Sequence, residues 1–354
     1  MTASLQQVKN VQRVTNVSNV KKPWTPVVLG LSLGFTLLST SWASLAAEVK
    51  EIKQTYNGLT VNANLVMGDQ QTYADGIVLL THGTLTHKDR STYAQLQENL
   101  AAQGISSLAP SLSLGLNDRK GEYDCAVPHT HKHTDAIKEI GFWMDWLKQQ
   151  GANSVTLMGH SRGGNQTAWF ANEHDSAQIN KVVLLAPATG EQQSASEYQE
   201  KYGKPLADVL KKANALVAKG QGESLMKDTD FIYCKAAQVT PNAFVDYYTV
   251  KPQFDTPTLL KTAKKPTLVI MGADDTVVAD LPKKMAPLAS NALIKTVTIM
   301  DAEHFFLDLA SEDAAAAAAE FIKQNKSFRD LFVMPCSDTA SVDFTGVDCG
   351  SSPQ

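Results

Sequence analysis

Three residues whose side chains can together cleave an acyl bond stand in the order serine, aspartate, histidine along this chain. Ser161 lies in the pentapeptide Gly-His-Ser-Arg-Gly, Asp275 ends the run Gly-Ala-Asp-Asp, and His304 ends the run Asp-Ala-Glu-His. A serine hydroxyl becomes a strong nucleophile when a histidine takes its proton and a carboxylate orients that histidine. If the fold brings them together, these residues predict nucleophilic attack on a carbonyl carbon.

The serine stands at a change of local structure. The apolar run 155–158 is typical of a buried strand, and 165–170 can continue as a helix. A serine at so sharp a turn needs neighbours without side chains, because the strand and the returning helix pass close together, and Gly159 and Gly163 supply this. The turn would expose Ser161 Oγ and point N–H groups of the new helix at the acyl group.

The elements that must position these residues alternate between strand and helix. Residues 59–67 alternate with a period of two, whereas 76–80 are continuously apolar, as in a strand that is buried on both faces. Further strands are predicted over 49–54, 105–109, 181–186, 267–271 and 293–300, and helices over 91–103, 135–149 and 311–323, the last capped by Ser311. This alternation predicts an α/β fold with a mostly parallel, doubly wound sheet and helices on both faces.

The interval 191–264 interrupts this alternation. It contains a helical stretch, 198–219, and an aromatic cluster of Phe244, Tyr247 and Tyr248, and it lies between two predicted sheet strands. We interpret it as a helical cap over the site, inserted late in the chain. The predicted domains are therefore a core of 47–190 and 265–325, a cap of 191–264 and a polar tail of 326–354.

The chain resembles the α/β-hydrolase superfamily from near Leu59 to near Lys323. The glycine-flanked serine, the acid after a strand and the histidine after the final strand carry this resemblance, in the order that this superfamily uses. The resemblance implies an α/β-hydrolase fold and a serine hydrolase that needs no cofactor and no metal. Serine as the nucleophile argues against haloalkane dehalogenase and epoxide hydrolase relatives, which use an aspartate there.

The resemblance also implies a role for each side chain. His304 would take the proton of Ser161 during attack and return it to the leaving group, and Asp275 would hold the imidazole tautomer and stabilise its charged form. Asp274 is the alternative acid. The family places the acid three residues after the strand-end glycine, which favours Asp275.

Backbone N–H groups would stabilise the negative oxygen that forms during attack. The resemblance implies one from Arg162, directly after the nucleophile, and one from Thr84, because relatives with a His-Gly-x turn use the residue after the glycine. His82 and Gly83 form that turn, and His82 would orient the loop by hydrogen bonding. Only one glycine follows His82, so the sequence lacks the His-Gly-Gly-Gly pattern of some esterases and lipases.

Residues 1–46 have the pattern of a signal peptide. Four basic residues precede an apolar segment over 26–38, and small residues stand at 44 and 46, where a signal peptidase cleaves. The apolar segment is shorter than the roughly 20 residues of a membrane span. An uncleaved anchor is the alternative. We expect cleavage after Ala46, a periplasmic or secreted protein, and no stable membrane span thereafter.

Four cysteines, an even number, fit an oxidising compartment and predict disulfides. Three pairings of four cysteines are possible. We favour Cys336 with Cys349, which would tie down the tail, and Cys125 with Cys234, which would join a loop to the cap. No cysteine pair has the C-x-x-C spacing of zinc or redox sites.

The other histidines have less specific surroundings. Cys125, His129, His131 and His133 are spaced like metal ligands, but the residues between them are equally typical of a polar loop, which we favour. His160 lies inside the sharp turn around Ser161, which we call the elbow, and is interpreted as a packing residue. We therefore predict no metal site.

Composition excludes little beyond nucleic-acid binding. The 354 residues are 43% hydrophobic and 19% charged, as in ordinary globular proteins, and the formal net charge of −4 offers no basic surface. We expect an exported serine hydrolase of a small-molecule carboxylic ester. A peptidase, thioesterase or lipase with the same triad is the alternative enzyme. A non-catalytic hydrolase-like binding protein of the cell envelope is the alternative of another class, and no oligomeric state is predicted.

Overall fold

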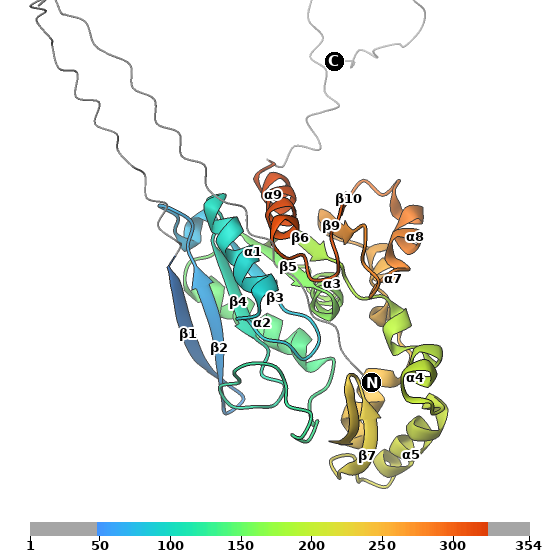
Figure 1. The fold of residues 1–354 in the computed structure, drawn as a ribbon. Coiled ribbons are helices and arrows are strands. Elements are labelled where there is room, and N and C mark those ends of the chain that lie inside the picture. Colours follow the sequence, from blue (N-terminus) through green and yellow to red (C-terminus); the bar gives the residue numbers. More distant parts are fainter. Residues whose placement is uncertain (1–47, 325–354) are drawn as a thin grey trace, which may run out of the picture. The chain divides into compact units, whose positions relative to one another are not determined.

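The apolar runs of the sequence form one eight-stranded sheet in the computed structural model, which describes residues 48–324 (Figure 1). The strands, in spatial order, are β1 (Val49–Tyr56), β2 (Leu59–Val66), β4 (Ser107–Ser111), β3 (Ile77–Thr81), β5 (Val155–His160), β6 (Ile179–Leu185), β9 (Thr267–Gly272) and β10 (Ile294–Ile299). β2 is antiparallel to β1 and β4, and the other neighbours are parallel. The predicted mostly parallel sheet is confirmed.

Some predictions concern residues that the structure does not describe. The predicted signal peptide, 1–46, the predicted tail, 326–354, and the predicted pair Cys336–Cys349 lie outside the described residues. Cys125 and Cys234 form a disulfide with a Cα–Cα distance of 5.3 Å, which confirms the other predicted pair. Within residues 48–324, no helix has the length and apolar character needed to span a bilayer.

Helices cover both faces of the sheet, as predicted. α1 (Ser91–Ala102) packs against α9 (Leu309–Lys323), and α2 (Asp135–Gln149) packs against α3 (Arg162–Glu173); Figure 1 shows the two pairs on opposite faces. The buried residues of α2 recur at intervals of three and four, so one side of this helix faces the sheet. A short helix, α8 (Leu281–Met285), lies between β9 and β10.

Several predicted boundaries in the core differ from the structure by two residues, and two of these differences have a clear physical cause. The last helix begins at Leu309, not at Ser311, whose buried hydroxyl instead accepts a hydrogen bond from Asn99 Nδ2 at 3.1 Å and so joins α9 to α1. β4 continues through Pro110, which lies opposite Ala63 of β2. Proline is tolerated there because β3 pairs only with the first residues of β4, so its missing N–H is not needed on that side.

The interval between β6 and β9 contains a hairpin as well as helices. Its elements are α4 (Ala195–Tyr202), α5 (Leu206–Ala218), β7 (Met226–Phe231), β8 (Cys234–Val239), α6 (Pro241–Tyr248) and α7 (Thr256–Leu260). The single helical stretch predicted over 198–219 is wrong, because the chain turns at Gly203, which has a left-handed φ of 66°, and again before Pro205. The β7–β8 hairpin was not predicted.

The interval has an apolar cluster of its own. The aromatic residues Phe244, Tyr247 and Tyr248 are buried in it, together with Tyr123 from a loop of the core. α7, in contrast, packs into the cluster of the sheet through Leu260. We call residues 191–250 the cap from here on, since they share this second cluster.

Candidate active site

Ser161 lies at the end of β5, where the chain reverses into α3. Its φ of 56° and ψ of −125° are a strained conformation for a residue with a Cβ. A Cβ on Gly159 would lie 2.5 Å from the Gly163 carbonyl oxygen, and a Cβ on Gly163 would lie 2.6 Å from the Thr81 carbonyl oxygen. The two glycines therefore allow β5, α3 and the end of β3 to meet beneath the serine.

The structure brings Ser161, His304 and Asp275 together. Ser161 Oγ lies 2.9 Å from His304 Nε2, and His304 Nδ1 lies 2.8 Å from Asp275 Oδ2. When Nδ1 carries the proton, His304 donates to the carboxylate and accepts from the serine hydroxyl. The exposed fractions of the His304 and Asp275 side chains are 6% and 4%. This geometry can transfer the serine proton to the imidazole in a site shielded from water.

Asp275 is held by the chain that follows it. Oδ1 accepts hydrogen bonds from the N–H groups of Val277 at 2.8 Å and Val278 at 3.1 Å. Burial alone would raise the pKa of the carboxyl, but the hydrogen bond and charge of His304 and the two backbone donors outweigh it, so the pKa of Asp275 is lowered. Asp274, the alternative acid, is exposed. The acid in contact with His304 is Asp275.

A chain of hydrogen bonds that the sequence did not reveal joins the loops of the site. The Gly83 N–H donates to Tyr93 Oη at 2.7 Å, and that hydroxyl lies 2.9 Å from His160 Nδ1. His160 Nε2 lies 2.8 Å from the carbonyl oxygen of His304. Burial, and then the charge of His304, lowers the pKa of His160 to about 3, so the ring is neutral and can accept from Tyr93 while donating to that carbonyl.

No local signal in the sequence marks this link, because Tyr93 and His160 are 67 residues apart. The sequence predicted a helix over 91–103, which contains Tyr93, but no partner for its hydroxyl group. The hydroxyl group of a fully buried tyrosine nevertheless requires a polar partner. That requirement was the one available signal, and it does not identify the partner.

The two expected oxyanion donors are joined through side chains. Arg162 Nε donates to Thr84 Oγ1 at 2.9 Å. The Gly83 N–H is already bonded to Tyr93, so the next N–H of this loop, that of Thr84, is the one left for a bound oxygen. A Cβ on Gly83 would lie 3.2 Å from Ser161 Cβ, which explains why the loop needs glycine this close to the serine.

His82 orients the loop after β3. Its Nδ1 lies 2.8 Å from the Gly83 carbonyl oxygen, and its Nε2 accepts from the Leu112 N–H at 2.9 Å. Arg119 Nη2 lies 3.1 Å from the same Nε2 and also donates to the Thr86 carbonyl oxygen at 2.6 Å. Burial and the charge of Arg119 lower the pKa of His82 to about 3, which keeps the ring neutral as a fixed link between loops.

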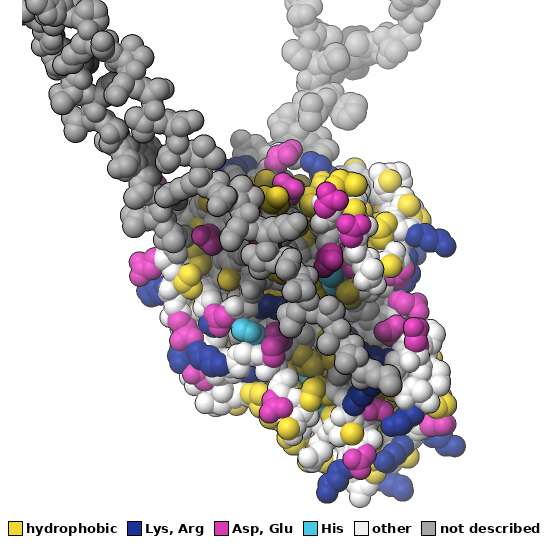
Figure 2. Space-filling model, viewed as in Figure 1, with side chains coloured by type: hydrophobic (Ala, Val, Ile, Leu, Met, Phe, Trp, Pro, Cys, Tyr) yellow, Lys and Arg dark blue, Asp and Glu magenta, His cyan; other side chains and the backbone are white. Residues whose placement is uncertain are grey.

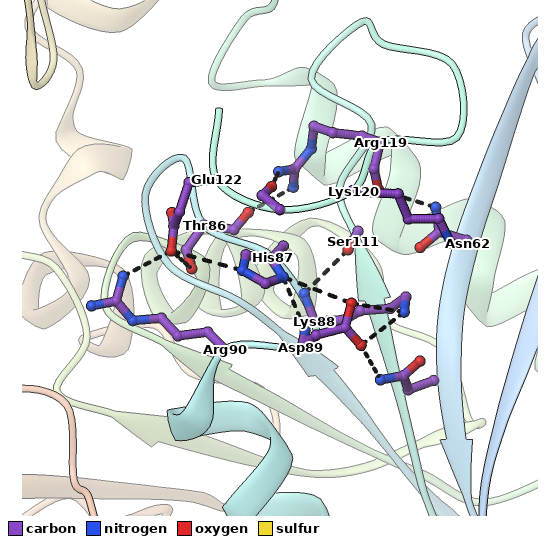
Figure 3. Close-up of polar contacts among 12 residues, drawn as sticks. Asn62, Thr86, His87, Lys88, Asp89, Arg90, Ser111, Arg119, Lys120 and Glu122 are labelled. Atoms are coloured by element: carbon purple, nitrogen blue, oxygen red, sulfur yellow. Dashed lines mark hydrogen bonds and ion pairs between the residues drawn. The ribbon is translucent and has the colours of Figure 1, made fainter. Parts of the chain in front are cut away.

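The site opens into a cavity of about 260 Å³ that Ser161 and His304 both line. Glu122 stands at its edge and accepts from Thr86 Oγ1 and from Arg90 Nη1, both at 3.0 Å; Figure 3 shows Glu122 between these two residues. The Arg90 guanidinium also lies 4.4 Å from the ring centroid of Phe305, next to His304. Polar contacts thus fix the wall of a cavity with room for a small acyl group.

His129, His131 and His133 are buried between the core and the cap. His129 Nδ1 lies 3.2 Å from His131 Nε2, and His131 Nδ1 lies 3.0 Å from Tyr247 Oη. Cys125 is committed to its disulfide, and no group of three or more metal-binding side chains occurs within the described range 48–324. Burial lowers the pKa of all three rings, that of His129 to about 4, so they are neutral hydrogen-bonding groups between the two regions.

A family model described as "Serine aminopeptidase, S33" matches residues 72–312. That range contains the elbow, the strand-end acid and the final histidine. No curated protein matches the chain at a significant level.

Solved structures of similar fold cover most of the described chain. Est1E from Butyrivibrio proteoclasticus has 17% identity and a TM-score of 0.52 over 77% of this chain and 98% of its own. A structure of ferulic acid bound to Est1E has 19% identity and a TM-score of 0.56 over 77% and 97%. The Pyrococcus furiosus esterase Pf2001 has 16% identity and a TM-score of 0.50 over 78% and 91%. At these identities the similarity demonstrates the shared fold.

Proposed function

Because this chain belongs to the α/β-hydrolase family described as serine aminopeptidase, S33, we propose that it is an exported serine hydrolase that cleaves a carboxylic ester. One observation carries the proposal. A serine in a strained turn is hydrogen-bonded to a histidine, which is hydrogen-bonded to a buried carboxylate. Strain of this kind persists where it serves a site, and here it holds Ser161 Oγ at the mouth of a cavity.

In the first step Ser161 Oγ attacks the carbonyl carbon while His304 Nε2 takes the hydroxyl proton. The carbonyl oxygen becomes negative and accepts hydrogen bonds from the N–H groups of Thr84 and Arg162. His304 then gives its proton to the leaving alcohol as the carbon–oxygen bond breaks. An acyl-serine remains.

In the second step a water molecule attacks the acyl-serine. His304 takes one proton of the water and returns it to Ser161 Oγ, and the carboxylic acid leaves. Asp275 is ionised throughout, because its pKa is lowered, and its charge stabilises the imidazolium that forms in each step.

An amide or peptide is the second candidate substrate. The name of the family specifies a peptidase, whereas Pf2001 is an esterase by name. The same three side chains attack esters, thioesters and amides. We rank a lipase lower, because side chains of both charges are distributed over the part of the cap that is visible in Figure 2, whereas a lipase would present a broad apolar face.

The test is the turnover of a series of p-nitrophenyl esters, from acetate to long acyl chains, by the mature protein and by Ser161→Ala. We expect wild-type protein to prefer short or medium chains and the alanine variant to lose turnover by several orders of magnitude. If neither protein cleaves an ester, aminoacyl amides and thioesters are tested with the same pair. Failure of all substrates, together with no labelling by a fluorophosphonate, would support the non-catalytic binding protein.

Export is the second part of the proposal, and it is tested separately. Expression of the full chain in a Gram-negative host should give a periplasmic or secreted protein that begins at Ala47. Intact mass measurement of the fractionated protein determines the start. A chain that retains Met1 in the membrane fraction would contradict cleavage and support the anchor.

A further inference from the structure

A second cavity lies beside the first, between the cap and the core. Its volume is about 420 Å³. Tyr233, in the turn between β7 and β8, and Val277, two residues after Asp275, line both cavities. The two cavities therefore adjoin at these two side chains, and a substrate whose carbonyl group is at Ser161 would have to extend past them to reach the second cavity.

The side chain of Arg162 forms one wall of this second cavity and is only 7% exposed. Its guanidinium donates to Thr84 Oγ1, lies 3.4 Å from His133 Nδ1, and lies 5.4 Å from the ring centroid of Tyr247. With its amide oxygen turned toward the guanidinium, Gln193 accepts from Nη2 at 3.0 Å. All four partners are neutral.

Arg162 therefore carries a buried charge that is not balanced locally. Among residues 48–324, no carboxylate lies within ion-pair distance of its guanidinium. A buried charge is strongly destabilising unless an opposite charge accompanies it. Thr84 occupies Nε, and the Gln193 amide oxygen contacts both terminal nitrogens. A carboxylate would displace that neutral amide and bind the two terminal nitrogens in the paired geometry that guanidinium and carboxylate prefer.

Lys201 of α4 provides a second positive charge in the same cavity. Its Nζ lies 4.1 Å from the ring centroid of Tyr233, one of the two side chains that line both cavities. Burial lowers the pKa of Lys201; nearby Glu197 opposes this, and the charge of Arg162 lowers the pKa further. The two cations thus repel one another across the cavity, and an anion between them would remove that repulsion.

The acidic residues that line this cavity are otherwise engaged or exposed. Asp280 pairs with Lys284 at 2.9 Å and accepts from Thr189 Oγ1 at 3.0 Å. Glu191 is exposed and accepts from serine hydroxyls at the start of α4. Glu197 is exposed in the first turn of that helix. Among the described residues, the charged side chains of the cavity that are at least partly buried and have no ion-pair partner are consequently the positive ones of Arg162 and Lys201.

We propose that Arg162 and Lys201 form an anion subsite, and that the natural substrate is an ester carrying a second, free carboxylate. This inference rests on the proposed hydrolase function and names its substrate class. The carboxylate enters the second cavity while the ester carbonyl is at Ser161. It belongs either to the acyl part, as in a hemiester of a dicarboxylic acid, or to the alcohol part.

Two matched substrate pairs test the subsite and distinguish these sources. The acyl pair is the p-nitrophenyl hemiester of glutaric acid against p-nitrophenyl pentanoate, which has the same chain length without the charge. The alcohol pair is 4-carboxyphenyl butyrate against phenyl butyrate. We expect wild-type kcat/KM to favour the anionic member of one pair at least tenfold. The pair that shows the preference identifies the side of the ester that carries the charge.

Arg162→Met should reduce that preference about 10- to 100-fold, the range of a charged hydrogen-bonded contact. Arg162→Lys should restore part of it. Lys201→Met should reduce it less, because this side chain is only partly buried. Lys211→Met, an exposed lysine of α5 outside the cavity, is the matched control and should leave the preference unchanged. The preference is a ratio, so a general loss of turnover in the arginine variants cancels.

Binding of glutarate to Ser161→Ala, measured by calorimetry, tests the subsite without turnover. We expect the additional Arg162→Met change to weaken this binding at least tenfold. Esters cleaved without an anionic preference would overturn the subsite and leave the hydrolase function intact. Glutarate binding without any acyl turnover would overturn the function and retain the subsite. A preference for substrates with a free amine would overturn the subsite and support an aminopeptidase.

Discussion

The sheet and the cap hold their side chains in place by different means. The cluster of the sheet is largely aliphatic and comes from strands whose residues are buried in unbroken runs, such as β3 and β5. The cluster of the cap is rich in tyrosine, and the hydroxyls bond to distant backbone groups: Tyr198 donates to the Asp230 carbonyl oxygen at 2.9 Å, and Tyr248 accepts from the Ile232 N–H at 2.9 Å.

We relate this difference to function: the reacting groups belong to the sheet, and the groups proposed to select the substrate belong to the cap or, in the case of Arg162, contact it. The groups proposed to carry out the reaction stand at the ends of strands, where glycines allow the close backbone contacts that hold them in place. The groups proposed to select the substrate are long side chains of the cap and of Arg162, held by rings and hydroxyls. Changes in the sheet should therefore affect turnover of every substrate, and changes in the cap should affect stability and selectivity first.

The largest expected effect is a loss of kcat on replacement of Asp275, and the adjacent carboxylate of Asp274 serves as its control. Asp275→Asn should lower kcat on the preferred ester about 10⁴-fold, because an amide favours the wrong tautomer of His304. Asp274→Asn, its exposed neighbour, should change kcat less than twofold. Steady-state kinetics of both variants measures this. Equal losses of kcat in the two variants would mean that the hydrogen bond to His304 does not decide which aspartate supports catalysis.

The next largest expected effect is the loss of stability on removal of the disulfide between the core loop and the cap. Cys125→Ser combined with Cys234→Ser should lower the free energy of unfolding by about 2–4 kcal/mol, because the unfolded chain gains freedom over a separation of 109 residues. Urea denaturation measures the loss, and limited proteolysis should then cut the cap first. If the core is cut first, the bond does not hold the cap preferentially.

Replacement of a core glycine tests whether close backbone contacts hold Ser161 in position. Gly163→Ala should lower the free energy of unfolding by about 1–3 kcal/mol, because its Cβ would overlap carbonyl oxygens of the β3 loop. Turnover should fall about 10²-fold as the serine is displaced. Gly141→Ala in α2 is the matched control, since its Cβ would lie 3.4 Å from the ring of Phe170, an ordinary contact. Two variants with equal stability and turnover would contradict this account.

The smallest effect concerns the buried histidines beneath the cap. The pKa of His129 falls from its usual value near 6.5 to about 4 on folding, so the unfolded chain binds more protons between these values. Stability is therefore full above pH 6.5 and is lost as the pH falls toward 4, by at most about 1.4 kcal/mol per pH unit for one ring.

Urea denaturation at pH 7.5 and pH 5 measures this loss in wild-type protein and in His129→Phe. The variant keeps a ring but has no proton to bind, so it should lose less stability between the two values. His174→Phe, at an exposed ring, is the control and should behave as wild type. An unchanged loss in His129→Phe would mean that protonation of His129 does not weaken the cap.

The sequence predicted the sheet better than the cap, and the reason is physical. Buried parallel strands and the elbow around Ser161 are encoded by adjacent residues, so periodicity and glycine spacing indicate them. The β7–β8 hairpin turns at Ile232 and Tyr233, and Ile232 has a φ of 58°. A two-residue hairpin turn usually contains glycine or asparagine, so these residues gave no signal. The hairpin depends on packing and on the disulfide.

Within the site, too, the sequence indicated features encoded by adjacent residues but not contacts between distant residues. The order of Ser161, Asp275 and His304 was visible because each follows a predicted strand. The link from Gly83 through Tyr93 to His160 and the contact of Arg162 with Thr84 are pairings between distant positions. A single sequence contains the residue types of such pairs but not their partners.

The place at which the cap leaves the sheet affects how such a chain can diverge. β6 and β9 are direct neighbours, paired from Val182 opposite Thr267 to Leu185 opposite Ile270. The ends of the intervening segment are therefore held together by strand pairing, whatever lies between them. Insertions, deletions and substitutions in the cap leave that register unchanged. Over generations, a lineage with this topology can acquire new substrates while inheriting the same reaction.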